Sequence, residues 1–284
     1  EHHQRFSEFI LKNNPKNVLE IGGAHGILAK NCLSKIDIPW TILEPNPHPV
    51  EGCKANFIKG FFDKNFKIDI NVDTIIHSHL LEHIYNPLEF FKDLSRTKIS
   101  TKLIFSLPNL HEMLIRKYTN CLNFEHTIFI TEPLIEFLLS SNGFEIIDKT
   151  YFKDDHSIFY NCVKTNQTKI KNLPNDYYQV NKSIFISYIK YHEKLIKELN
   201  CTINQNKSDI FLFGAHIFSQ YLLEFGLNSN KISYILDNDK EKQGKRLYGS
   251  KLFVKSPKIL KNVERPLIIL KAGVYNDEIK EDIL

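Results

Sequence analysis

The sequence predicts an α/β fold with a mostly parallel sheet, followed by a second, smaller α/β domain. Two observations lead to this prediction. Short apolar runs alternate with helical segments along the first half of the chain, and the same alternation begins again after residue 200. In both halves a strand, a glycine turn, a helix and a strand ending in an acid follow one another. The 284 residues are enough for one large domain or two smaller ones.

The first domain is expected over residues 1–165. It opens with an amphipathic helix that Pro15 stops, because proline cannot continue a helix. A glycine turn separates the first strand from the second helix, and Gly143 caps a later helix. In chain order we predict helices at 1–14, 27–34 and 132–142, and strands at 17–21, 40–45, 57–60, 73–77, 102–108, 144–147 and 157–162. A further helix is expected after the fourth strand, beginning at Glu82 and His83.

Residues 166–200 are expected to form a linker and a helix, because a stretch rich in Asn, Lys and Thr precedes a helical pattern. The C-terminal α/β domain then occupies residues 201–284. Its predicted elements are strands at 209–213, 232–237 and 267–270 and a helix at 218–225.

Composition excludes several classes of function. Apolar residues make up 42% of the chain and charged residues 25%, as in an ordinary globular protein. The net charge is +4 without a basic stripe, which argues against nucleic-acid binding. No apolar run is long enough to span a membrane. The five cysteines form no Cys-x-x-Cys pair, so we expect no metal site and a reducing, cytoplasmic location.

A ligand site is predicted at the first strand-to-helix turn. Ligands of open parallel sheets bind at the carboxyl ends of the strands, where backbone must approach the ligand, and glycine permits that approach. Gly22, Gly23 and Gly26 supply it. Glu44 ends the second strand 18 residues after Gly26, where an acid can accept hydrogen bonds from ribose hydroxyls.

A glycine turn with a distal acid is compatible with NAD or with S-adenosylmethionine. Two details favour S-adenosylmethionine. The spacing Gly22-Gly23-x-x-Gly26 departs from the G-x-G-x-x-G fingerprint of dinucleotide sites. Glu20 precedes the turn on the strand, where a carboxylate suits a sulfonium or amino-acid group better than a pyrophosphate.

Three stretches, 18–26, 77–87 and 105–109, resemble the motifs of the class I methyltransferase superfamily. The resemblance implies a Rossmann-like methyltransferase sheet that binds S-adenosyl-L-methionine and releases S-adenosyl-L-homocysteine. It implies that the glycines flank the methionine part and that Glu44 holds the ribose. Pro45 and Asn46 then lie beside the adenosine, and Phe61 or Phe62 flanks the adenine. The residues we assign to the cofactor are Glu20, Gly22, Gly23, Gly26, Glu44, Pro45, Phe61 and His77.

Methyl transfer requires aligned reactants and, for some acceptors, a base, a role that histidine fills near neutral pH. The histidines available around the predicted site are His77, His79, His83, His111 and His126. The stretch Asn123-Phe124-Glu125-His126 resembles the loop of sugar C-methyltransferases in which a Glu-His pair removes a proton beside a keto group. The resemblance implies His126 as base and Glu125 as the residue that orients it. We add Asn123 and His79 to the catalytic candidates.

Residues 208–279 resemble the C-terminal nucleotide-fold domain of the same sugar C-methyltransferases, and we assign them to substrate binding or to structure. The expected partner is therefore a small molecule, a sugar nucleotide. Two departures leave alternatives open: the family's cysteine-rich zinc domain has no counterpart, and Asn123 replaces a tyrosine. The alternatives are an O-methyltransferase acting on a surface-glycan or capsule precursor, and a non-catalytic subunit that binds a sugar nucleotide. An NAD-linked reductase is a further one.

Overall fold

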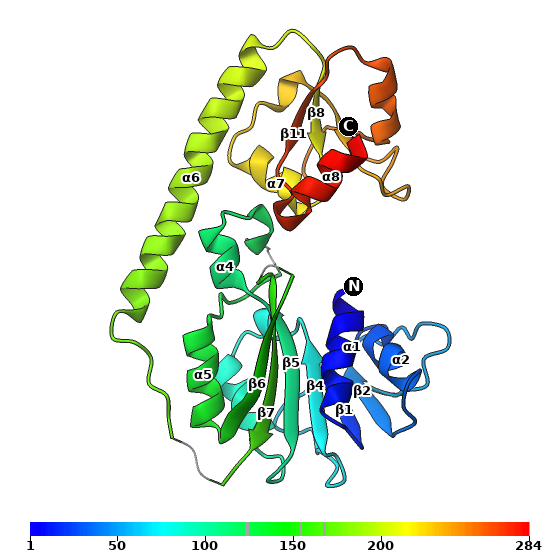
Figure 1. The fold of residues 1–284 in the computed structure, drawn as a ribbon, viewed down its shortest axis with the longest axis vertical. Coiled ribbons are helices and arrows are strands. Elements are labelled where there is room, and N and C mark those ends of the chain that lie inside the picture. Colours follow the sequence, from blue (N-terminus) through cyan, green and yellow to red (C-terminus); the bar gives the residue numbers. More distant parts are fainter. Residues whose placement is uncertain (123–124, 154, 167–168, 284) are drawn as a thin grey trace. The chain divides into compact units, whose positions relative to one another are not determined.

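The computed structural model describes residues 1–122, 125–153, 155–166 and 169–283. The chain divides into two compact units. Unit 1 comprises Glu1–His111 and Glu125–Asn175, and unit 2 comprises Glu112–Phe124 and Asp176–Leu284. The long helix that the sequence places between the two domains belongs to unit 2, since that unit begins its second segment at residue 176. Figure 1 labels many of the helices and strands of both units.

Unit 1 is built on a seven-stranded sheet with the order β3-β2-β1-β4-β5-β7-β6. The first five strands along the chain pair in parallel, and β7 runs antiparallel between β5 and β6. This arrangement confirms the predicted α/β fold with a mostly parallel sheet. The strands are β1 (Val18–Ile21), β2 (Trp40–Glu44), β3 (Asn56–Lys59), β4 (Thr74–Ser78), β5 (Lys102–Pro108), β6 (Phe144–Phe152) and β7 (Ser157–Lys164).

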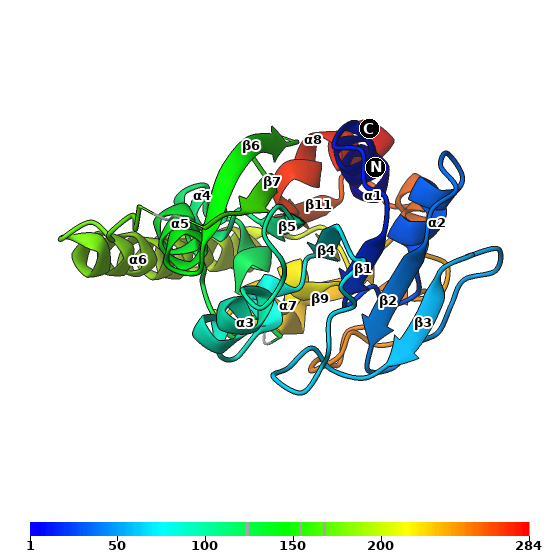
Figure 2. The ribbon, with the colours of Figure 1, turned by 90° about the horizontal axis from the view of Figure 1, so that it is seen from below.

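Helices cover both faces of this sheet, as Figure 2 shows from below. Helices α1 (His2–Lys12) and α2 (Ile27–Leu33) contribute to a buried cluster with Trp40, Ile42 and Ile76. Helices α3 (Pro87–Leu94) and α5 (Glu132–Ser141) contribute to the cluster on the other face, which includes side chains of β1, β4 and β5. Burial on both faces explains why the central strands read as continuous apolar runs.

Helix α3 is the helix expected after the fourth strand, but it begins at Pro87 and not at Glu82, and its start carries clear signals. The side chain of Asn86 accepts a hydrogen bond from the backbone N–H of Glu89 at 3.2 Å, and Pro87 occupies the first turn. Both features are typical of helix N-termini. The segment that we expected to begin a helix at Glu82 is instead a short 3₁₀ turn, Leu81–His83.

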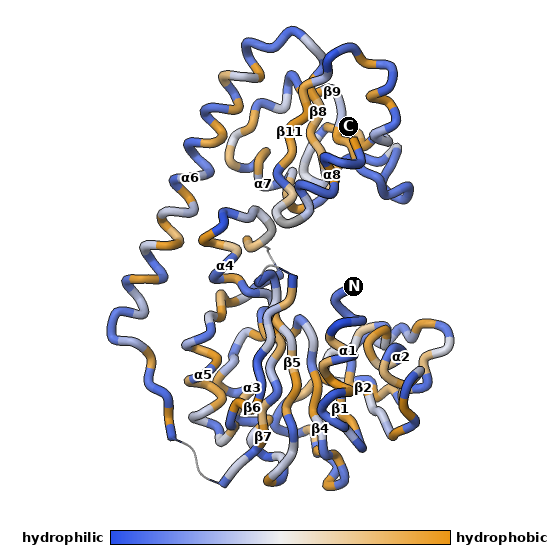
Figure 3. The backbone as a smooth tube through the Cα atoms, in the orientation of Figure 1, coloured by the Kyte–Doolittle hydropathy of each residue, from blue (hydrophilic) through white to orange (hydrophobic). Residues whose placement is uncertain are grey.

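Unit 2 holds a four-stranded parallel sheet with the order β10-β9-β8-β11. This sheet confirms the second, smaller α/β region. Figure 3 shows the apolar colouring of β8 and β11, whereas α6 alternates polar and apolar residues along its length. The strands are β8 (Ile210–Phe213), β9 (Ile232–Leu236), β10 (Val254–Lys255) and β11 (Leu267–Leu270). The helices are α6 (Tyr177–Gln205), α7 (Ile217–Glu224) and α8 (Asn276–Ile283).

The remaining elements are short. Helix α4 (Leu110–Ile115) follows β5. The other 3₁₀ turns are η2 (Thr119–Cys121), η3 (Ser229–Lys231), η4 (Pro257–Asn262) and η5 (Gly273–Tyr275). Among the helices of the described residues, none is both long enough and apolar enough to cross a membrane.

Candidate functional site

The sheet of unit 1 has its topological switch between β1 and β4, because the chain moves from β1 to β2 and β3 on one side and to β4 on the other. The carboxyl ends of β1 and β4 are therefore where a ligand of this fold binds. Gly22 begins the turn there with φ +71, and its N–H donates to the carbonyl oxygen of Leu43 at 2.9 Å. A Cβ on Gly22 would lie 2.9 Å from Leu80 Cδ1.

The other two glycines of the turn are required by packing within the protein. A Cβ on Gly23 would lie 2.7 Å from Ile42 Cγ2. A Cβ on Gly26 would lie 2.7 Å from Cys53 Sγ, and Gly26 also has φ +73. From the sequence, these glycines were expected to permit the approach of a ligand, whereas in the structure the side chains beneath the turn already exclude a Cβ.

Glu44 closes the site from the end of β2. Its Oε2 accepts a hydrogen bond from the backbone N–H of Ala24 at 3.0 Å, and its Oε1 accepts one from the N–H of Asn46 at 3.0 Å. A carboxylate with both oxygens held by backbone still has lone pairs for two hydroxyl donors. The residues present therefore fit an adenosine ribose, with half-buried Pro45 next to the acid in the chain.

The two phenylalanines after β3 have different environments. The Phe61 side chain is 74% exposed, so one face is available to a planar ring. Phe62 packs at 5.9 Å from Phe66 and at 5.6 Å from Phe90, centroid to centroid, and belongs to the core. Of the two candidates for the adenine, Phe61 is the one that the structure leaves accessible.

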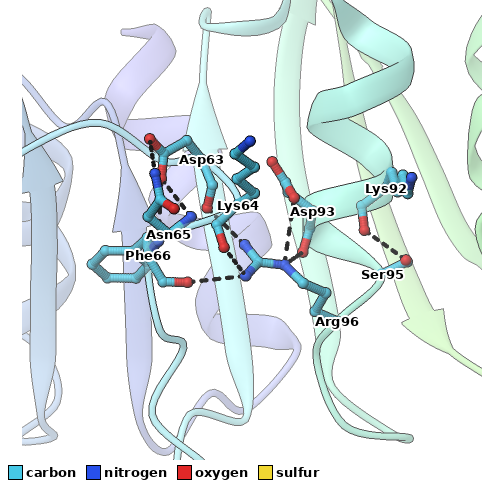
Figure 4. Close-up of polar contacts among 8 residues, drawn as sticks. All are labelled: Asp63, Lys64, Asn65, Phe66, Lys92, Asp93, Ser95 and Arg96. Carbon is cyan, nitrogen blue, oxygen red and sulfur yellow. Dashed lines mark hydrogen bonds and ion pairs between the residues drawn. The ribbon is translucent and has the colours of Figure 1, made fainter.

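The loop after Phe62 is held by an arginine that the sequence analysis missed. Arg96 follows α3, and its guanidinium donates to three backbone carbonyl oxygens: those of Asp63 at 2.7 Å, Lys64 at 2.9 Å and Phe66 at 3.2 Å. Figure 4 shows this clamp together with Asp93, which lies 3.5 Å from Arg96 Nε. Sequence carries no signal for it, because the partners are backbone groups about thirty residues away in the chain.

Glu20 lies behind the glycine turn, which corrects the expectation that it contacts the cofactor directly. Its side chain is buried, and its Oε2 accepts a hydrogen bond from the indole N–H of Trp40 at 2.8 Å. A Cβ on Gly23 would lie 2.8 Å from its carboxyl carbon. Burial raises the pKa of this carboxyl to about 7, and the indole hydrogen bond acts in the opposite direction.

His77 lies inside the core, which corrects its assignment to the cofactor. Its side chain is fully buried, and it stacks on Phe105 with 4.8 Å between ring centroids. Neither ring nitrogen has a hydrogen-bond partner among the described residues. Burial lowers its pKa to about 3, so the ring is neutral and acts as an apolar surface.

His126 lies beside His83, with 5.3 Å between the two ring centroids. Ligand atoms of these two rings and of the Glu82 carboxyl lie within 4.8 Å of one another. The Glu82 side chain is buried, and its Oε2 has no hydrogen-bond partner among the described residues. Burial raises the pKa of this carboxyl to about 7. One oxygen and two imidazole nitrogens could hold a divalent cation, and they also form an acid–base group.

Glu125 takes part in this arrangement through its backbone. Its carbonyl oxygen accepts a hydrogen bond from His83 Nδ1 at 2.9 Å, which fixes the orientation of that ring. The Glu125 residue itself is exposed. The neighbouring Thr127 donates from its N–H to the carbonyl oxygen of Glu82 at 2.9 Å. The predicted catalytic residue Asn123 lies outside the described residues.

His79 belongs to a neighbouring group of histidines and has φ +48. Its Nε2 lies 3.1 Å from His2 Nε2 and 3.5 Å from Ser157 Oγ, and its Nδ1 lies 3.7 Å from Glu82 Oε1. Burial, with further contributions from His2, His156 and two other histidines, holds its pKa well below the ordinary value. His79 is therefore neutral, and through Glu82 it joins the group around His126.

Comparisons with known proteins found two family models and several solved structures that are similar to this chain. Residues 1–149 match a family model described as "Methyltransferase domain", and residues 176–283 match one described as "C-methyltransferase C-terminal domain". No curated protein matches the chain. A solved S-adenosylmethionine-dependent methyltransferase from Clostridium acetobutylicum shares 15% identity, with 58% of this chain and 92% of that chain covered and a TM-score of 0.45. Magnesium protoporphyrin IX methyltransferase from Synechocystis, solved with bound SAH, shares 16%, with 58% and 84% covered and a TM-score of 0.45.

Proposed function

The chain belongs to the S-adenosylmethionine-dependent methyltransferase family, and from that premise we propose that it methylates a carbon atom of a nucleotide-linked keto-deoxysugar, with His126 as the base. The observation that carries the proposal is the proximity of His126, His83 and the buried Glu82 carboxyl. Glu82 and His83 follow β4, one of the two strands at the switch point of the sheet, and His126 lies in the segment before α5.

A carbon acceptor needs a base because a C–H group is acidic only beside a carbonyl. His126 removes that proton, and the electrons of the C–H bond form an enolate that donors must stabilise as it develops. S-adenosylmethionine supplies the electrophilic methyl group and leaves as S-adenosylhomocysteine. The enolate carbon forms the new bond to the methyl group, and His126 passes its proton to solvent.

Glu82 and His83 support the base in this proposal. The Glu82 carboxyl lies close enough to stabilise a positively charged imidazolium, and the apolar surroundings strengthen that interaction. Because His83 Nδ1 donates to the Glu125 carbonyl oxygen, Nε2 of the neutral ring is the acceptor and can take a hydrogen bond from a substrate hydroxyl. Glu125 thus orients His83 through its backbone carbonyl, and His79 contributes through Glu82.

For the cofactor, we propose that Glu44 holds the ribose hydroxyls and that Phe61 covers one face of the adenine. Gly22, Gly23 and Gly26 shape the turn beside the methionine part, and Pro45 borders the adenosine. Glu20 supports this turn from beneath, since its carboxyl lies under Gly23.

The match of residues 176–283 to a C-methyltransferase C-terminal domain supports carbon rather than oxygen as the acceptor. We propose on the same ground that the substrate is a sugar nucleotide, as the sequence resemblance implies. An O-methyltransferase would need no enolate, and therefore no base beside a ketone.

The test is methyl transfer from isotopically labelled S-adenosylmethionine to a uridine-diphosphate-linked 4-keto-6-deoxyhexose and to its 4-hydroxy counterpart. The proposal expects product from the keto sugar alone, with the labelled methyl on carbon by NMR. His126→Asn should lower the rate by about 10²–10⁴-fold, and the control His111→Asn should leave it unchanged. Label on oxygen, or equal use of the hydroxy sugar, would refute carbon methylation.

A further inference from the structure

We propose that unit 2 carries a second nucleoside site, built on Asp237 after β9, that binds the ribose and phosphates of a nucleoside diphosphate. The site is independent of the one that takes S-adenosylmethionine in unit 1. The proposal that this site binds a nucleoside diphosphate does not depend on the proposed function. The proposal that it holds the nucleotide part of the acceptor does.

The four strands of the unit 2 sheet have the same order and direction as four of the seven strands of the unit 1 sheet. Its order β10-β9-β8-β11 corresponds to β3-β2-β1-β4, and all pairings in both groups are parallel. The topological switch of unit 2 therefore lies between β8 and β11. By the same rule that places the cofactor site of unit 1, a ligand of unit 2 binds at the carboxyl ends of these strands.

The acid after the second strand is bonded in the same way in both units. Asp237 Oδ2 accepts from the N–H of Ala215 at 2.8 Å, and Oδ1 accepts from the N–H of Asp239 at 2.9 Å. Glu44 has the same two partners, an alanine of the glycine turn and the residue two positions after the acid. Asp237 is thus held where an acid of this fold meets ribose hydroxyls.

The glycine turns also correspond. The N–H of Gly214 donates to the carbonyl oxygen of Leu236 at 2.7 Å, just as Gly22 donates to Leu43. Gly214 has φ +99, and an added Cβ would meet no atom within 4 Å, whereas the Cβ position of Gly22 is closed by Leu80. The turn of unit 2 therefore has an open face that a ligand can approach.

One difference indicates which nucleoside fits unit 2. Lys242 Nζ lies 3.3 Å from Asp237 Oδ2, with 37% of its side chain exposed, whereas Glu44 has no ion pair with any described residue. A cation here opposes the sulfonium and ammonium groups of S-adenosylmethionine and attracts phosphates. Helix α7 begins three residues after Gly214 and adds a helix N-terminus, which favours anions. These charges point to a nucleoside diphosphate.

Calorimetric titration of the full chain with uridine diphosphate, and separately with S-adenosylhomocysteine, tests this site. We expect one uridine diphosphate per chain. Asp237→Asn should lower the affinity for uridine diphosphate at least tenfold and leave the affinity for S-adenosylhomocysteine within twofold of wild type. Glu44→Gln should lower the affinity for S-adenosylhomocysteine at least tenfold and leave the affinity for uridine diphosphate within twofold. Lys242→Met keeps both hydrogen bonds from the backbone to Asp237. It should lower the affinity for uridine diphosphate and leave the affinity for S-adenosylhomocysteine unchanged.

Three results would overturn the proposal: no binding of uridine diphosphate, unchanged affinity in both unit 2 variants, or a second S-adenosylhomocysteine per chain that Asp237→Asn removes. If Asp237→Asn fails to fold by thermal melting, Lys242→Met decides alone. Failure of the proposed reaction is distinguishable, because these titrations involve no methyl transfer. Uridine diphosphate binding that depends on Asp237 would survive even if no keto sugar is methylated.

Discussion

The carboxylate of Glu44 is joined to the backbone N–H of Ala24 by a 3.0 Å hydrogen bond, which ties the end of β2 to the glycine turn after β1. With the second bond to Asn46, both carboxylate oxygens are oriented before any ligand arrives. A preorganised acceptor loses little conformational entropy on binding. The same arrangement recurs at Asp237 and Ala215 in unit 2.

Glu44→Gln should weaken S-adenosylhomocysteine binding by about 10-fold or more, which corresponds to roughly 1.4 kcal/mol. The amide keeps one acceptor but replaces the other oxygen with a donor that faces either a backbone N–H or a ribose hydroxyl. Isothermal titration calorimetry measures the change, and the exposed Glu51→Gln provides a matched control. Equal affinity in Glu44→Gln and wild type would show that the ribose lies elsewhere.

Arg96→Lys should loosen the loop that follows Phe61. A lysine keeps the charge but cannot donate to the carbonyl oxygens of Asp63, Lys64 and Phe66 together, as Arg96 does. We expect faster amide hydrogen exchange across residues 61–66 and a loss of about 1 kcal/mol in unfolding free energy. Arg5→Lys on α1 is the control. Unchanged exchange in residues 61–66 would show that Arg96 does not hold the loop.

Gly23→Ala should destabilise the fold by about 1–3 kcal/mol, because the new methyl group meets Ile42 and Glu20 at less than 3 Å. Gly60→Ala is a matched control, since its nearest neighbour is Leu43 Cδ1 at 3.4 Å. Urea denaturation of both variants measures the difference. If the two variants lose equal stability, the turn is not packed as described.

Glu20→Gln should change the pH dependence of stability. Burial raises the pKa of Glu20 from 4.5 to about 7, so the folded state holds this proton more tightly than the unfolded chain does. The contribution of this bound proton to the free energy of unfolding is fully present below about pH 4.5 and is lost as the pH rises through 7. Glutamine does not titrate and keeps an acceptor for the Trp40 indole.

We therefore expect the variant to gain about 2 kcal/mol over wild type between pH 5 and pH 8. Urea denaturation at the two pH values measures this gain, with Glu51→Gln as control. A difference between variant and wild type that is the same at both pH values would contradict the raised pKa.

The sequence predicted most of the framework because the signals were local. The apolar run Val18–Ile21 is buried along its whole length, and Gly22 follows it with positive φ. The strand bounds differ from the prediction mainly where tertiary pairing extends an element. Strand β6 reaches Phe152 because β7 pairs with it along its length, and no local pattern marks that end.

Side-chain direction was harder to predict than position in the chain. The sequence placed His77 at the carboxyl end of a strand but could not show that its ring stacks on Phe105. Glu20 was expected to face the ligand, whereas the indole of Trp40, twenty residues away, holds it inside. The proximity of His126 to His83 and Glu82 could not be predicted either. The two loops are joined by hydrogen bonds to backbone groups of Glu125 and Glu82, which leave no pattern in the sequence.

The most direct test of the account is proton exchange at the carbon beside the keto group. Wild type and His126→Asn are incubated in deuterated water with S-adenosylhomocysteine and a uridine-diphosphate-linked 4-keto-6-deoxyhexose, and NMR follows the C–H signal. The account predicts that wild type exchanges this proton without any methyl donor and that His126→Asn slows the exchange by about 10²-fold or more. Exchange at equal rates in both proteins would contradict the role of His126 as the base.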